Sequence, residues 1–230
     1  MSSKATIAST VADDLRHRIV CGELRPDEKL NVARLADGFG VTLSPVREAL
    51  NRLISEGLVQ LRDMRGFSVS PVSIEELDEI TRTRIWLTEV ALRQSIAHGD
   101  EIWLESLVLS HYRLQRTPRM RTDKPGSGRA WDEAHRIFHR ALTAGCRSRP
   151  LVTYCDQLFI MADRYRHLAR SSPQQRGRQG DEEHQRILDA VIARDADGAV
   201  RLMAKHFETT AAMCRALLVR SATKVTRRQR

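Results

Sequence analysis

The sequence is poor in aromatic residues and cysteine, and it contains no long apolar run. Aromatic residues make up 5% of the 230 residues, a composition that favours helices cored by aliphatic side chains over a β-sandwich. The four cysteines lie far apart, which excludes the paired spacing of a zinc ribbon or a disulfide scaffold. No stretch approaches the ~18 consecutive apolar residues of a membrane span, and residues 1–11 lack the apolar core of a secretory signal.

Positive charge is in excess, but it is unevenly distributed. The 38 Lys+Arg against 29 Asp+Glu give a formal net charge of +9, which suggests a nucleic-acid partner. Residues 1–72 nevertheless hold ten basic and nine acidic residues, whereas residues 113–129 and 215–230 each hold six basic residues and at most one acidic residue. A non-specific coat for the chromosome must neutralise many phosphates. The near-neutral segment 1–72 argues against that role.

Residues 1–72 change their hydrophobic pattern several times over short distances. Apolar residues at four-residue spacing predict a first helix, Asn31 can cap a second, and Pro45 suits the first position of a third. The first helix is expected to end near Gly22, the second to span 32–39 and the third to begin at Ser44, with short strands at 59–61 and 67–70. The pattern predicts an N-terminal winged helix-turn-helix domain of three helices and a two-stranded wing.

The rest of the chain has an almost entirely helical pattern. Ser73 and Glu76 predict a capping box at the start of a long helix. The helices are expected at about 73–99, 101–117, 131–144, 150–170, 182–193 and 196–220, with polar loops at 117–129 and 171–181. We therefore expect a mainly α protein, with an antiparallel bundle of six to seven helices over residues 73–221 and a basic tail at 222–230.

The third helix has an exposed face suited to DNA. A helix fits the major groove, where the guanidinium of Arg47 can bridge guanine O6 and N7 or clamp a phosphate. Thr42 and Ser44 precede it with hydroxyl groups that favour phosphate. Arg65 and Gly66, at the hairpin tip, are expected to reach the minor groove, because glycine permits a tight turn. The alternative is a protein-interaction module in which Arg47 is an ordinary surface charge.

The segment LADGFGVTLSPVREALNRLISEGLV resembles the GntR family of bacterial repressors. The resemblance covers nearly all of residues 10–72 and is strongest at PVREAL, residues 45–50. It implies that five residues contact DNA, namely Thr42, Ser44, Arg47, Arg65 and Gly66. Leu43 departs from the pattern, because the family usually has arginine there, so the operator of a relative cannot be assumed for this chain.

Four histidines are spaced in a way that can form a metal site. His135 and His139 are four residues apart on one expected helix and therefore project from the same face. His184 lies near the start of a later helix, and His206 lies inside the last one. Four converging imidazoles would favour zinc, with nickel as a further possibility. The alternative is that each histidine is an ordinary polar residue at the edge of the core, with its hydrogen bonds satisfied.

Residues 74–220 resemble the FCD domain of the FadR subfamily of GntR regulators. The family's ligand positions correspond to HRIFH at 135–139, to EH at 183–184 and to His206. The resemblance implies a divalent metal and small carboxylic acids as effectors. His135 replaces the usual aspartate, which disfavours a hard cation such as magnesium. Arg84 and Tyr165 are expected to bind the effector, although Thr88 stands where the family usually has glutamate.

The segments WDEAHRIFHRAL, RYRHLA and EEHQRILDA are most similar to carbon-starvation-induced regulators of this subfamily, which implies a dicarboxylate such as glutarate. We expect a homodimeric repressor in the bacterial cytoplasm, associated with the nucleoid, that leaves a palindromic double-stranded DNA operator when its effector binds. The alternative is a metalloenzyme that uses the four-histidine site and has an N-terminal interaction domain. The sequence contains no H-E-x-x-H or G-x-S-x-G motif for such catalysis, so we expect no enzyme.

Overall fold

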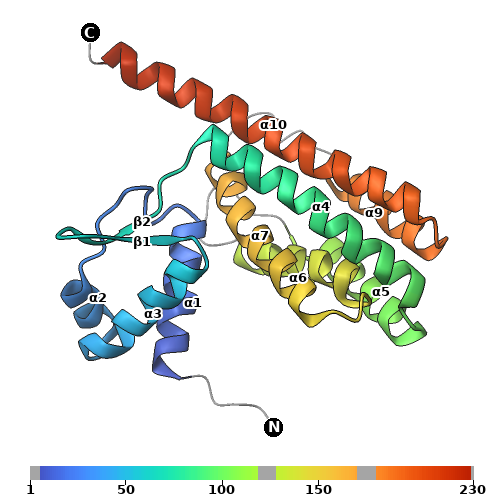
Figure 1. Cartoon of the computed structure of the whole chain (residues 1–230), viewed down its shortest axis with the longest axis horizontal. Coiled ribbons are helices and arrows are strands. Elements are labelled where there is room, and N and C mark those ends of the chain that lie inside the picture. The colour runs from blue at the N-terminus through green and yellow to red at the C-terminus, as the bar shows by residue number, and fades with distance from the viewer. Residues whose placement is uncertain (1–5, 119–127, 170–179, 229–230) are drawn as a thin grey trace. The chain divides into compact units, whose positions relative to one another are not determined.

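The computed structural model describes the backbone of residues 6–118, 128–169 and 180–228, and the side chains of these ranges up to Val219. The chain forms two compact units (Figure 1). Unit 1 comprises Met1–Leu77, Ile160–Ser171 and Cys214–Arg230, and unit 2 comprises Asp78–Phe159 and Ser172–Met213. The structure is mainly helical, as predicted. Within the described residues, no helix is long and apolar enough to cross a membrane.

Unit 1 begins with three short helices, α1 (Ile7–Val20), α2 (Val32–Phe39) and α3 (Leu43–Ser55). The side chain of Asn31 caps α2 by accepting a hydrogen bond from the N–H of Arg34 at 3.1 Å, as predicted. The inward faces of α1 and α3 meet in an apolar core, in which Leu15 and Leu50 are fully buried. This core holds the exposed face of α3 in a fixed position.

The wing is an antiparallel hairpin of β1 (Val59–Arg62) and β2 (Gly66–Val69). Val59 pairs with Val69 at the inner end, where both are buried, and Arg62 pairs with Gly66 at the outer end. Met64 and Gly66 have positive φ values of 59° and 76° at the tip. Glycine reaches this conformation without a Cβ clash, and the residue type at 66 therefore suits the turn.

The third helix begins one residue earlier than the sequence analysis predicts. Leu43 is its first residue, and Thr42 is its N-cap, without a side-chain capping hydrogen bond. Pro45 is therefore the third helical residue rather than the first. It still lies in the first turn, where backbone N–H groups have no intrahelical acceptor, so its missing N–H has no cost.

Six further helices follow in the described residues, within the predicted range of six to seven. They are α4 (Ile74–His98), α5 (Glu101–Arg116), α6 (Arg129–Ala144), α7 (Arg149–Leu168), α9 (Gly180–Ile192) and α10 (Ala196–Arg228). The last helix continues past residue 220, so the expected tail at 222–230 is helical up to Arg228. The expected loops fall largely at residues 119–127 and 170–179, outside the described residues.

The core of unit 2 forms where α5 packs against α6 and α9. Leu107, Phe138, Leu142 and Ile187 are fully buried there. The indole Nε1 of Trp103 donates a hydrogen bond to the carbonyl oxygen of Ala141 at 2.8 Å and so ties α5 to α6. This packing fixes the inner face of α6, which carries two of the predicted metal ligands.

Candidate DNA-binding surface and metal centre

Helix α3 has a buried apolar face and an exposed polar face. Val46 and Leu50 are fully buried in the core of unit 1. Thr42, Ser44 and Arg47 are exposed at the other side of the helix start, where the sequence analysis expects DNA contacts. The residues that hold the helix are therefore distinct from those that face solvent.

Two arginines of α3 have different surroundings. Arg52 forms an ion pair with Glu48 and donates a hydrogen bond to the hydroxyl of Ser9 at 2.8 Å. Arg47 has no side-chain hydrogen bond or ion pair among the residues that the structure describes. Its guanidinium thus keeps all five N–H donors for a ligand, whereas that of Arg52 is held by its own protein.

The tip of the wing is exposed. Met64 is fully exposed, and Arg65 and Gly66 beside it are also exposed. Arg62, at the base of the turn, pairs with Asp27 at 3.1 Å. The wing tip therefore presents an apolar side chain and one cation to solvent from a braced hairpin.

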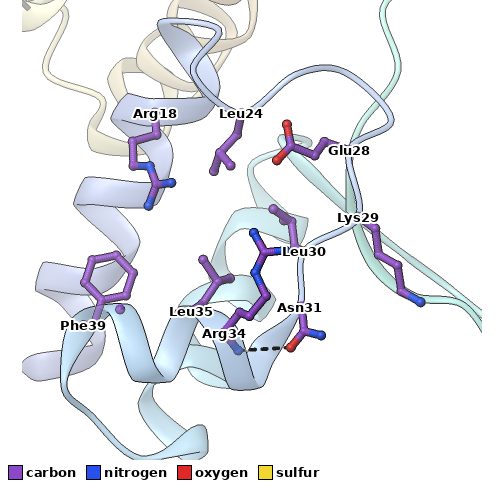
Figure 2. Close-up of a pocket in the computed structure, with 10 residues that line it drawn as sticks. Arg18, Leu24, Glu28, Lys29, Leu30, Asn31, Arg34, Leu35 and Phe39 are labelled. Atoms are coloured by element: carbon purple, nitrogen blue, oxygen red, sulfur yellow. Dashed lines mark hydrogen bonds between the residues drawn. The ribbon is translucent and has the colours of Figure 1, made fainter.

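A small hollow beside α2 was not anticipated (Figure 2). It has a volume of about 220 Å³. Arg18 on α1 and Arg34 on α2 line it together with apolar residues, among them Leu24 and Phe39, while Lys29 extends away from it in Figure 2. Its walls come from α1, α2 and the loop between them, so periodicity along any one element could not reveal it.

The four predicted histidine ligands lie together in unit 2. All four are buried, and each offers a ring nitrogen within 4.8 Å of those of the others. Helix α6 supplies His135 and His139, whose Nε2 atoms are 3.1 Å apart, while α9 supplies His184 and α10 supplies His206. Three helices thus bring four imidazole nitrogen donors together, a donor set that suits zinc or nickel.

The carboxylate of Glu183 contacts one of these histidines, His206. Oε2 of Glu183 lies 2.7 Å from Nδ1 of His206, an arrangement that fixes the ring orientation and makes the remaining nitrogen a better metal ligand. Aromatic rings surround the cluster. Trp131 stacks on His135 with ring centroids 4.7 Å apart, and Phe159 lies 5.1 Å from His139. The site is therefore pre-arranged and shielded from water.

Arg84 lies in the same region of unit 2. It is 9% exposed, and its guanidinium carbon lies 3.9 Å from the ring centroid of Phe207 and 5.5 Å from that of Phe159. Both rings also contact His139. The buried cation is thus held against the aromatic rings that border the histidines.

Thr88, which departs from the family pattern, is buried one turn from Arg84. Its side chain hydrogen-bonds to Cys155, and burial raises the pKa of that thiol to about 11 despite this bond. Cys155 therefore remains a neutral thiol at physiological pH. The glutamate expected from the family is replaced here by an uncharged pair.

Tyr165, the other predicted effector ligand, belongs to unit 1. Its hydroxyl donates a hydrogen bond to the carboxylate of Glu76 and accepts one from the N–H of Ser73 at 3.3 Å. Ser73 in turn caps α4, because its Oγ accepts from the N–H of Glu76 at 3.0 Å. The bond from the N–H of Glu76 to Ser73 confirms one half of the predicted capping box. In the other half, the hydroxyl of Tyr165 lies between the N–H of Ser73 and the carboxylate of Glu76 and bonds to both. Burial and the bond to Glu76 raise the pKa of Tyr165.

Arg164, next to Tyr165 on α7, holds the preceding residues of the chain. Its Nη2 donates to the carbonyl oxygen of Ser70 at 2.5 Å and also to that of Pro71. Two consecutive residues of α7 therefore grip the segment 70–76, which leads from the wing into α4. The residues that Arg164 contacts lie more than ninety positions earlier in the sequence, and no local signal in the sequence indicates this contact.

Comparison with known proteins agrees with this architecture. Residues 7–69 match the bacterial regulatory proteins of the gntR family, and residues 79–209 match the FCD domain. The chain is 35% identical to the uncharacterised HTH-type transcriptional regulator BphR of Paraburkholderia xenovorans, over 87% of this chain and 82% of that protein. It is 32% identical to the HTH-type transcriptional repressor GlaR of Escherichia coli, over 85% and 90% respectively.

Among solved structures, that of E. coli McbR/YncC is similar. It has 26% sequence identity and a TM-score of 0.75, and the match covers 93% of this chain and 98% of that chain. Residues 7–69 and 79–209 are thus each matched to a family in sequence, and 93% of the chain is matched in fold. The chain belongs to the GntR family of bacterial regulatory proteins, with an FCD domain after its winged helix-turn-helix, and is a DNA-binding transcriptional regulator rather than an enzyme.

Proposed function

We propose that this regulator is a homodimeric repressor that leaves its operator when a small carboxylate binds at a metal held by the four histidines. The observation that carries the proposal is the buried cluster of His135, His139, His184 and His206, with ligand atoms within 4.8 Å of one another. A set of buried imidazoles supported by a carboxylate is costly to assemble unless it binds something.

The donor set supports a divalent metal of the zinc or nickel type. All four ligands are neutral when they bind, so the positive charge of an ion would be offset only by Glu183, one bond further out. When bound, the ion would supply a Lewis-acidic positive charge for an effector carboxylate. The aspartate that His135 replaces would have cancelled part of that charge.

Arg84 supports an effector with a second carboxylate. A guanidinium binds a carboxylate through two parallel hydrogen bonds, and the rings of Phe159 and Phe207 hold that of Arg84 beside the histidines. A five-carbon dicarboxylate such as glutarate has two charged ends and an apolar middle that suits these rings. We propose Arg84 as the ligand of the end that is remote from the metal.

The surface of unit 1 supports recognition of a palindromic operator in the bacterial nucleoid. Arg47 would read a base edge, Thr42 and Ser44 would bind phosphate, and Arg65 and Gly66 would approach the minor groove. One winged helix covers only a half-site, so two copies are required. Exposed apolar residues of unit 2 could supply the dimer contact, namely Trp86 and Val90 on α4 and Ile102, Leu109 and Tyr112 on α5.

Helix α7 supplies a route between effector and DNA. Its Phe159 contacts His135 and His139 in unit 2, while its Arg164 and Tyr165 grip the segment 70–76 in unit 1. An effector that favours one position of α7 would thereby shift the population of wing positions. In this proposal the DNA-bound state is the less favoured one once effector is present.

The test measures operator binding by fluorescence anisotropy, on DNA selected from a random duplex library. Glutarate is added to metal-loaded protein and to protein stripped with EDTA. We expect glutarate to weaken DNA binding only for the metal-loaded protein, and His139→Ala to bind DNA normally without a glutarate response. An equal glutarate response in stripped protein would refute the metal-dependent part of the proposal, and no response to any dicarboxylate would refute the effector class.

A further inference from the structure

Leu43 is an exposed apolar residue at the start of the helix that faces DNA. It is the first residue of α3, and its exposed fraction is 48%. Its two neighbours, Thr42 and Ser44, are also exposed, and the apolar face of α3 does not include it. The core of unit 1 therefore does not explain a leucine at this position.

Leu43 shares a helix face with Arg47. Residues four apart on an α-helix project from the same side, one turn from each other. Residues at the N-terminus of a recognition helix are those that reach base edges. If Arg47 contacts one base pair, Leu43 lies at a neighbouring pair in the same groove.

The chemistry of leucine limits what it can recognise there. Its side chain has no hydrogen-bond donor, so it can bind neither a phosphate nor a guanine edge. The apolar feature of the major groove is the 5-methyl group of thymine. We propose that Leu43 contacts a thymine methyl in each half-site and so specifies an A·T pair beside the pair or phosphate bound by Arg47. This inference rests on the proposed operator recognition by α3.

The experiment removes only the methyl group. In the selected operator, each thymine is replaced in turn by uracil, symmetrically in both half-sites, and the dissociation constant is measured by anisotropy. We expect one thymine position at which uracil weakens binding by about three- to fivefold per half-site, the value of one buried methyl group. At that position Leu43→Ala should bind thymine and uracil equally well.

Two further variants separate this contact from general effects. Ile7→Ala removes another exposed apolar side chain of unit 1, with an exposed fraction of 60%, and should keep the full sensitivity to uracil. Leu43→Arg should change the base selected at that one position from an A·T to a G·C pair. Each variant is compared with the parent protein by thermal unfolding, since a surface substitution should leave folding intact.

The outcomes distinguish this inference from the proposed function. If no duplex is bound specifically, operator recognition itself fails. If a specific operator is found but uracil is tolerated at every position, or Leu43→Arg selects the same sequence as the parent protein, only the thymine contact is refuted.

Discussion

Oε2 of Glu183 lies 2.7 Å from Nδ1 of His206, and this contact joins two helices that each contribute a histidine to the cluster. Glu183 directly precedes His184, so one short segment of α9 supplies both a proposed ligand and the carboxylate that orients another. The cluster thus depends on a residue that does not itself belong to it.

Replacing Glu183 with alanine should weaken metal binding by about 10- to 100-fold, because His206 would lose the acceptor that fixes its ring. The measurement is competition for zinc against a chromophoric chelator at constant pH. Glu182→Ala is the matched control, since Glu182 is exposed and pairs only weakly with Arg186 at 3.6 Å. Equal affinities for the two variants would show that Glu183 has no supporting role.

Removal of metal should lower the thermal stability of the protein. An ion held by α6, α9 and α10 would cross-link three helices, and a ligand at 100 times its dissociation constant stabilises a fold by about 2.7 kcal/mol. For a chain of this size, that corresponds to a fall in Tm of about 5–10 °C on chelation. Scanning calorimetry with zinc or with EDTA measures it. His139→Ala should have the same Tm with zinc as with EDTA. If the Tm of the parent protein also does not change on addition of EDTA, the proposed cross-link by the metal is contradicted.

Arg47→Ala should abolish specific operator binding while metal content stays unchanged. A bidentate contact to a base contributes about 1–3 kcal/mol of discrimination, and a dimer would lose it twice. Arg52→Ala is the control on the same helix, because the guanidinium of Arg52 is held by Glu48 and Ser9. Anisotropy and elemental analysis give the two readouts. Arg47 has no role in recognition if its variant binds the operator as tightly as that of Arg52.

Tyr165→Phe should destabilise unit 1 by about 1–3 kcal/mol, because it leaves the N–H of Ser73 and the carboxylate of Glu76 without the hydroxyl that joins them. Urea unfolding measures the loss. Tyr154→Phe on the same helix is the control, since Tyr154 is 57% exposed. If Tyr165 binds the effector instead, the phenylalanine variant will lose glutarate affinity with little change in stability.

The sequence predicts best those features that depend on neighbouring residues. The spacing of His135 and His139 places both on one helix face, and the alternation around residues 59–70 indicates the wing. Proximity of His184 and His206 to that face depends on how α9 and α10 pack. The spacing alone leaves this open, and the resemblance to the FCD domain is what favours it. The sequence predicts that α3 begins at Ser44, whereas it begins at Leu43; Thr42 and Ser44 are equally good caps, so the sequence does not separate the two starts.

Tyr165 shows the limit of such reasoning. A tyrosine between two arginines near the histidine-bearing helices reads as a donor for an anionic effector. Its partners, Ser73 and Glu76, are about ninety residues away in sequence. In a capping box, the side chains of these two residues accept hydrogen bonds from each other's backbone N–H groups, so the sequence gives no reason to expect a third partner. Neither the segment around Ser73 nor the segment around Tyr165 therefore contains a pattern that predicts the contact between them.

The composition of unit 1 has a consequence for the modularity of such regulators. Ile160 packs against the core of the helix-turn-helix, and the Cε methyl group of Met161 lies 3.2 Å from the point that a Cβ on Gly57 would occupy. A fragment cut after Leu77 would lose these apolar contacts together with the grip of Arg164 on Ser70. In a chimera that joins the winged helix-turn-helix of one relative to the FCD domain of another, the end of α7 should therefore come from the same protein as the winged helix-turn-helix. The boundary between the two structural units does not fall at a single point in the chain.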